Sequence, residues 1–153
     1  MQSLIYKRTQ NSVLVSMIVI ITIILLAYQI IKSESTAETG ILIFIILFIL
    51  FIWLLMYRLT IKINDNYIIA IFGIGLLKRK IKISDIDFST LEITKPPMLA
   101  GVGIRLTPKG WLWNVKFGKA IYFKSKSGKT FFVGTDEPEI IVQKLRKVQS
   151  KNN

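Results

Sequence analysis

The stretch from Gly40 to Tyr57, GILIFIILFILFIWLLMY, contains no charged residue, and Trp53 and Tyr57 are its only side chains with polar groups. As a helix, its eighteen residues would extend about 27 Å, which is close to the thickness of the hydrocarbon core of a bilayer. The helix would be apolar on every side, so no face would suit water. Trp53, Tyr57 and Arg58 follow in the order of an interfacial anchor, with the aromatic residues before the cation. The stretch therefore predicts a transmembrane helix.

A second apolar run precedes this stretch. No charge occurs from Thr9 to Ile31, and residues 13–31 are almost wholly Val, Ile and Leu, which predicts another transmembrane helix. A cleaved signal peptide is the alternative, but the run is longer than a typical signal core and no small-residue cleavage motif follows it directly. Residues 32–39 are long enough only for a turn. We therefore expect residues 1–57 to form a short polar lead and a helical hairpin with spans of about 13–31 and 40–57, and residues 58–153 to form a soluble domain.

The charge distribution predicts the orientation of this hairpin. The net charge is +12, and residues 58–153 hold 18 Lys or Arg against 7 Asp or Glu. Cations flank the two runs at the ends away from the connecting turn, which predicts a multi-pass protein of the cell membrane with both termini in the cytoplasm. The predicted anchors at the membrane interface are Lys7, Arg8, Trp53, Tyr57 and Arg58.

The absence of certain residue types excludes several kinds of chemistry. The chain has no Cys and no His, which removes disulfides, thiol chemistry, catalysis by imidazole and most zinc sites. Neither apolar run contains an ionisable carboxylate or base that could carry protons or ions. We predict that the chain is not an enzyme and has no catalytic residues, no metal site and no cofactor.

After Tyr57 the sequence alternates between apolar and polar residues, as in half-buried β-strands. Short turns rich in Gly, Asn, Pro and Lys separate the alternating segments, which together predict about seven strands in a small antiparallel barrel or sandwich. Eight candidate segments, from which we expect about seven strands, are 58–63, 67–72, 77–84, 84–93, 102–107, 111–116, 120–125 and 130–133. An amphipathic helix should follow, because Thr135 or Asp136 can cap it and Ile141, Leu145 and Val148 repeat at helical spacing.

Four stretches resemble those of bacterial membrane proteins with a pleckstrin-homology-like (PH-like) domain: KISDI (82–86), GVGIR (101–105), PKGWLWNV (108–115) and GKTFFVGTDEPEIIVQKLRK (128–147). The resemblance implies an α+β chain in which two transmembrane helices precede a seven-stranded antiparallel PH-like barrel or sandwich capped by a C-terminal helix. Ile86 would fill its core. It implies no phosphoinositide specificity, because only Lys62 loosely matches the basic pattern of the eukaryotic lipid-binding members.

Two basic clusters are candidate binding sites for an anionic surface. The first is Lys78, Arg79, Lys80 and Lys82, and the second is Lys119, Lys124, Lys126 and Lys129. The alternative for the first cluster, which we favour, is a solvated sheet face or charged residues that protect an edge strand from pairing. For the second cluster we favour ordinary surface lysines of a hairpin over a binding site. In the first cluster, alternation puts Arg79 on the opposite face from the three lysines. Trp111 and Trp113 share one strand face, which favours packing over ligand binding.

The expected partner is the lipid bilayer, most directly its anionic phospholipid head groups, to which several adjacent cations would bind. The alternative is a membrane-anchored scaffold that binds a protein partner through the same domain. Charge alone would also suit nucleic acid, but the strands lack a set of stacking aromatic residues beside the basic ones. If the domain instead lies outside the cell, the partner would be a polyanion of the envelope.

Overall fold

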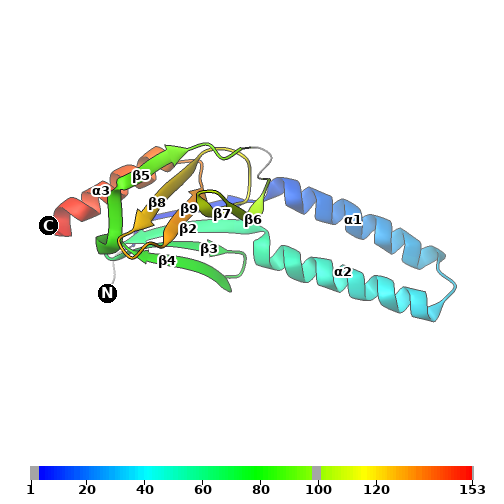
Figure 1. Cartoon of the computed structure of the whole chain (residues 1–153). Coiled ribbons are helices and arrows are strands. Elements are labelled where there is room, and N and C mark those ends of the chain that lie inside the picture. Colours follow the sequence, from blue (N-terminus) through cyan, green and yellow to red (C-terminus); the bar gives the residue numbers. More distant parts are fainter. Residues whose placement is uncertain (1–3, 98–100, 153) are drawn as a thin grey trace.

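The computed structural model describes residues 4–97 and 101–152, and it consists of a long helical hairpin joined to a β-rich domain (Figure 1). The hairpin helices are α1 (Val13–Lys32) and α2 (Thr36–Met56). Both are long and apolar enough to cross a membrane, in agreement with the two predicted spans. Helix α2 begins earlier than predicted, because Ser35 accepts a hydrogen bond from the backbone N–H of Glu38 (3.4 Å) and caps the helix.

The two helices are joined by a polar contact near the domain. The indole Nε1 of Trp53 donates to the hydroxyl of Ser16 on α1 at 3.0 Å, and the ring of Trp53 lies 5.2 Å from that of Tyr57. In an apolar environment this hydrogen bond satisfies both polar groups and fixes the rotation of one helix against the other. The predicted interfacial aromatic residues therefore also hold the hairpin together.

Residues Leu4–Asn11 form a strand, β1, which the sequence prediction missed by treating this segment as a polar lead. Strand β1 pairs with β2 (Arg58–Asn64), the strand that follows α2. It lacks a clear apolar face, because its inward side uses hydrogen bonds: the Tyr6 hydroxyl donates to Glu137 (2.9 Å), and the Gln10 amide donates to the Gly134 carbonyl (3.2 Å). Polar inward contacts of this kind leave no alternating apolar pattern.

The domain contains two sheets. The first has the order β1-β2-β3-β4, is antiparallel throughout and includes β3 (Tyr67–Phe72) and β4 (Leu77–Lys82). The second has the order β5-β8-β9-β7-β6. Its strands are β5 (Ile86–Thr94), β6 (Gly103–Thr107), β7 (Gly110–Asn114), β8 (Ala120–Ser125) and β9 (Thr130–Gly134).

The α+β class is confirmed, but the seven-stranded antiparallel barrel is wrong. The described residues form sheets of four and five strands, and β7 pairs with β9 in parallel. The β6–β7 hairpin thus joins the second sheet through β9, which comes two strands after β7 in the chain. Alternation along a strand does not encode the choice of such a partner.

The hydrophobic core lies between the sheets and is closed by α3 (Pro138–Asn152), which contacts β1, β5 and β8. Ile141, Leu145 and Val148 are buried there, as their helical spacing predicted, and Ile86 is buried in the same core. Thr135 accepts a hydrogen bond from the backbone N–H of Glu137 (3.2 Å) just before the helix. In Figure 1, α3 occupies the part of the domain away from α1 and α2.

Helices α1 and α2 join the first sheet at the same place. Ser12, between β1 and α1, donates its backbone N–H to the carbonyl of Tyr57, between α2 and β2, at 2.8 Å. The turn between β3 and β4 also meets the end of α2 here. Gly73 in that turn has φ of +49°, and a Cβ on it would overlap the backbone carbonyls of Leu54 and Leu55.

Replacing Gly73 by alanine should destabilise the protein much more than the same change at Gly128. Both glycines have positive φ, which costs an alanine about 1–2 kcal/mol, but a Cβ at Gly128 meets no atom within 4 Å. At Gly73 the overlap with two carbonyl groups adds to this cost, so we expect a loss of about 3 kcal/mol or more. Denaturant unfolding of the full chain in detergent, followed by circular dichroism, measures both changes. Equal losses would contradict the close contact between this turn and α2.

Candidate anion-binding site

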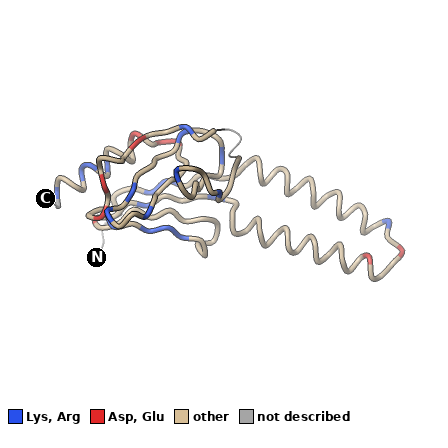
Figure 2. The backbone as a smooth tube through the Cα atoms, viewed as in Figure 1, with Lys and Arg blue, Asp and Glu red and all other residues tan. Residues whose placement is uncertain are grey.

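The two sheets differ sharply in charge. Strands β1 to β4 contain eight Lys or Arg and no Asp or Glu. The five strands of the second sheet contain two Lys or Arg and two Asp or Glu. Figure 2 shows that α1 and α2 carry charge only around the turn that connects them. The cationic excess of the strands therefore lies entirely in the sheet that continues from the two helices.

Six of these eight cations lie on the outward face of the first sheet, which we call the cationic face: Lys7, Arg58, Lys62, Lys78, Lys80 and Lys82. Strand register brings them together, because Lys7 pairs with Lys62, and Lys62 and Lys80 pair with the same residue, Ile69, from either side. Like charges on neighbouring strands repel one another, so this face is destabilising unless an anion or solvent screens it.

A cleft of about 290 Å³ lies on this face. Its lining residues come from β1, β2, the end of β3, the β3–β4 turn and the start of β4. The lining residues with cationic or hydroxyl groups are Lys7, Arg58, Lys62, Lys78, Thr9 and Thr60. The two threonine hydroxyls lie 3.0 Å apart and share a hydrogen bond. Ammonium, guanidinium and hydroxyl groups that converge in this way can donate several hydrogen bonds to one phosphate.

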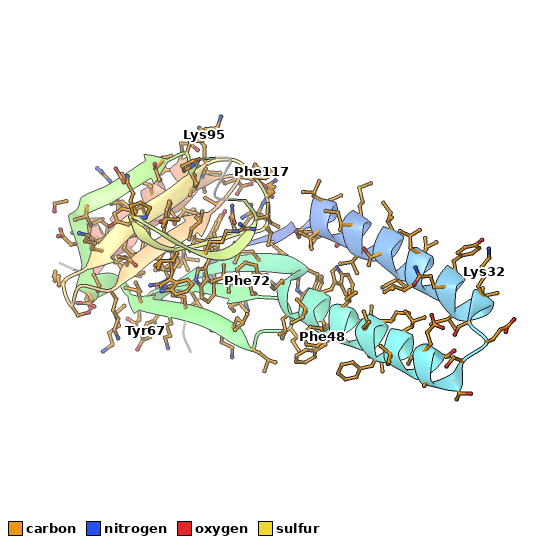
Figure 3. The ribbon with its side chains drawn as sticks, turned by 45° about the vertical axis from the view of Figure 1, so that its right-hand side comes forward. Lys32, Phe48, Tyr67, Phe72, Lys95 and Phe117 are labelled. Atoms are coloured by element: carbon orange, nitrogen blue, oxygen red, sulfur yellow. The ribbon has the colours of Figure 1, made fainter. Side chains whose placement is uncertain are left out.

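The cleft reaches the end of the sheet nearest the helices. Figure 3 labels Phe72 close to the junction with α2 and Tyr67, the first residue of β3, at the far end of the same strand. The cleft is lined by Ile71, Gly73 and Gly75, which belong to the near end. Arg58 is the first residue of β2 after α2. Because Lys7 and Lys62 also line it, the cleft extends from the middle of the sheet to the point where α2 joins the domain.

Within residues 4–97 and 101–152, no ion pair joins a cation of this face to a carboxylate. Arg58 instead donates its Nε to the Gly73 carbonyl (3.2 Å) and lies over the ring of Tyr57 (5.0 Å). Lys80 lies over the ring of Tyr67 (3.5 Å). The charge of the cleft is thus not neutralised by the described part of the protein.

The remaining two cations of the first sheet have structural contacts. Arg8 forms an ion pair with Glu137 (3.0 Å), so its guanidinium holds β1 to the start of α3. Arg79 donates hydrogen bonds to the Trp111 carbonyl (3.5 Å) and the Thr130 hydroxyl (3.3 Å) and so joins the two sheets. Burial lowers the pKa of Arg79, because the charged form loses solvation. The alternation that separated Arg79 from the neighbouring lysines is confirmed.

The second predicted basic group does not gather into a comparable site. Lys119 forms an ion pair with Glu139 (2.5 Å), and Lys126 donates to the Ser84 carbonyl (2.9 Å). Lys124 and Lys129 are exposed near the β8–β9 turn, whereas Lys119 precedes the other end of β8. These residues therefore belong to two separate places on the surface.

Sequence reasoning placed Lys7 and Arg58 only as membrane anchors and did not connect them with Lys78. The connection depends on β1, whose pairing with β2 brings together residues about fifty positions apart. One signal was available, since none of the four segments that form the first sheet contains an acidic residue.

Two apolar hollows lie elsewhere. One of about 330 Å³ lies between α1, α2 and the start of β6, where Trp53 and Met56 are among its lining residues. Another of about 560 Å³ lies against β9 and the β6–β7 turn, lined by several prolines and Leu106. Trp113 packs on the core, with its ring 5.5 Å from that of Phe72, whereas Trp111 is about half exposed.

Comparisons with protein families, with curated proteins and with solved structures found no match to this chain.

Proposed function

We propose that this chain is an integral membrane protein whose domain binds anionic phospholipid head groups in the cleft of the cationic face. The observation that carries the proposal is that Lys7, Arg58, Lys62 and Lys78 line one cleft, which extends from the middle of the first sheet to the end that joins α2. A membrane that contains α1 and α2 has its head groups at this level. The phosphates are then within reach of side chains that have no carboxylate partner among the described residues.

The energetics suit a tethered domain. A Lys or Arg near an anionic leaflet contributes about 1 kcal/mol, so the four cations of the cleft contribute about 4 kcal/mol together. The helices already hold the domain at the membrane, so binding does not carry the usual cost of bringing two free molecules together. A modest electrostatic attraction is therefore sufficient to select anionic lipids around the protein.

The fold and the location complete the proposal. Two packed sheets closed by a C-terminal helix support a PH-like domain of the bacterial membrane type, with more strands than the resemblance implies. We place the protein in the cell membrane with both termini in the cytoplasm, where anionic lipid is abundant. The chemistry proposed is binding, without catalysis or a cofactor.

Removing the charge of the cleft should reduce selectivity for anionic lipid. We would compare a triple variant, Lys7→Gln, Lys62→Gln and Lys78→Gln, with the unaltered full chain in detergent. Native mass spectrometry would measure binding of dioleoyl phosphatidylglycerol and dioleoyl phosphatidylcholine. Three contributions of about 1 kcal/mol correspond to a change of roughly a hundredfold in Kd for the anionic lipid, with little change for the zwitterionic one.

The matched control is a second triple variant, Lys124→Gln, Lys126→Gln and Lys129→Gln, which removes the same charge from the β8–β9 region. We expect it to retain the preference for phosphatidylglycerol. Equal losses in the two triple variants would show that net charge alone attracts the lipid, and the cleft would then not be the site.

The proposed orientation is testable because the chain contains no cysteine. A single cysteine introduced by Ser127→Cys lies in the exposed turn between β8 and β9. We expect a membrane-impermeant maleimide to label it only after cells are lysed. Labelling in intact cells would place the domain outside, and the cationic face would then meet an envelope polyanion.

A protein-binding scaffold is the second candidate, favoured by the 560 Å³ apolar groove beside Leu106 on the edge strand β6. In this case a partner would associate in a manner insensitive to salt, and the association would be lost in a Leu106→Ser or Trp111→Ser variant. Lipid selectivity would be unchanged in those variants, which separates the two candidates.

A further inference from the structure

The turn between β3 and β4 exposes two large aliphatic side chains beside the end of α2. Ile74 is 51% exposed and Leu76 is 68% exposed, although the residues before and after them, Phe72 and Leu77, pack in or against the core. A soluble turn of this length ordinarily uses polar residues at its exposed positions. Both exposed side chains would therefore be more favourably placed in an apolar environment than in water.

The backbone contacts of the turn fix its level relative to α2. Gly73 lies so close to the carbonyls of Leu54 and Leu55 that no Cβ fits between them. The Gly73 N–H donates to the Arg58 carbonyl (2.8 Å), and the Arg58 side chain donates back to the Gly73 carbonyl (3.2 Å). These contacts hold the β3–β4 turn against the last helical turn of α2, which is apolar.

Two backbone N–H groups of the turn, those of Gly73 and Gly75, are hydrogen-bonded within the protein. The Gly75 N–H donates to the Phe72 carbonyl at 2.8 Å, so the turn closes its own backbone hydrogen bond. Backbone groups in contact with lipid must be satisfied within the protein. Arg58 and Lys78 flank the turn, and their long side chains can reach the head groups while their stems remain in apolar surroundings.

We propose that the β3–β4 turn is inserted into the membrane interface, with Ile74 and Leu76 in contact with lipid acyl chains. The partner is the bilayer itself, because the turn continues the apolar surface of α2. The turn forms a third attachment beside the two spans and prevents the sheet from tilting freely. This inference rests on the proposed membrane insertion of α2 but not on the binding of anionic head groups, because apolar insertion needs no anionic lipid.

Spin labels measure this insertion directly. Three single-cysteine variants of the full chain, Ile74→Cys, Leu76→Cys and Ile140→Cys, would be labelled and reconstituted in vesicles of phosphatidylcholine alone. Ile140 is the matched control, since it is also a large aliphatic residue, 42% exposed, but belongs to α3, which Figure 1 shows in the part of the domain away from α1 and α2. Collision rates with oxygen and with a water-soluble nickel chelate report whether each label lies in lipid or in water.

We expect the ratio of oxygen to nickel collisions to be severalfold higher at positions 74 and 76 than at position 140. Water-like ratios at positions 74 and 76 would overturn the proposal. Lipid-like ratios at all three positions would also overturn it, because the turn would then not differ from α3 in its contact with lipid. The proposal of head-group binding can fail separately from the proposal of insertion. It fails if the lysine variants of the cleft leave lipid selectivity unchanged while positions 74 and 76 remain in lipid.

Discussion

The antiparallel pairing of β1 with β2 is the constraint on which the rest of this structure depends. These strands continue directly into α1 and from α2, and the hydrogen bond from Ser12 to Tyr57 closes the junction between them. The helical hairpin is therefore an insertion between two neighbouring strands of one sheet. No flexible linker separates the hairpin from the domain, so the orientation of the sheet follows from the orientation of the helices.

This arrangement explains why charge and location coincide. Because the first sheet extends directly from the helices, its near end must lie beside whatever surface the helices enter. Its strands carry cations without acidic residues, and the polar cleft opens at that near end. Repulsion among these cations by itself destabilises the strand pairings that bring them together. The anionic lipid that we propose as the partner at this position would offset that cost and would give the charge pattern a physical reason.

The parts of the fold that depend on local patterns were predictable from the sequence. The uncharged run from Gly40 to Tyr57 predicted a helix, which α2 confirms, and the alternation from Leu77 to Lys82 assigns the faces of β4 correctly. Strand β1 was not predictable in this way, because Tyr6 and Gln10 satisfy its inward side with hydrogen bonds to distant residues. The same holds for the parallel pairing of β7 with β9, which no local pattern specifies.

The candidate site was only half predictable for the same reason. The lysines of β4 were visible as a cluster, but the cleft needs Lys7 and Thr9 from a strand that sequence reasoning did not recognise. Arg58 was expected only as an anchor after the aromatic residues. Its role at the wall of the cleft depends on the β3–β4 turn, whose Gly73 accepts a hydrogen bond from its side chain. Local periodicity does not report such a contact between a turn and a helix end.

The distance between lipid phosphorus and the guanidinium of Arg58 tests the central claim most directly. Solid-state NMR of the full chain in phosphatidylglycerol vesicles measures it through dephasing of the ¹⁵N signal of arginine side chains by ³¹P. The account predicts strong dephasing for Arg58 and none for Arg146, which lies on α3. An undephased Arg58 signal would contradict the claim that the cleft binds lipid phosphate, even if both helices cross the membrane.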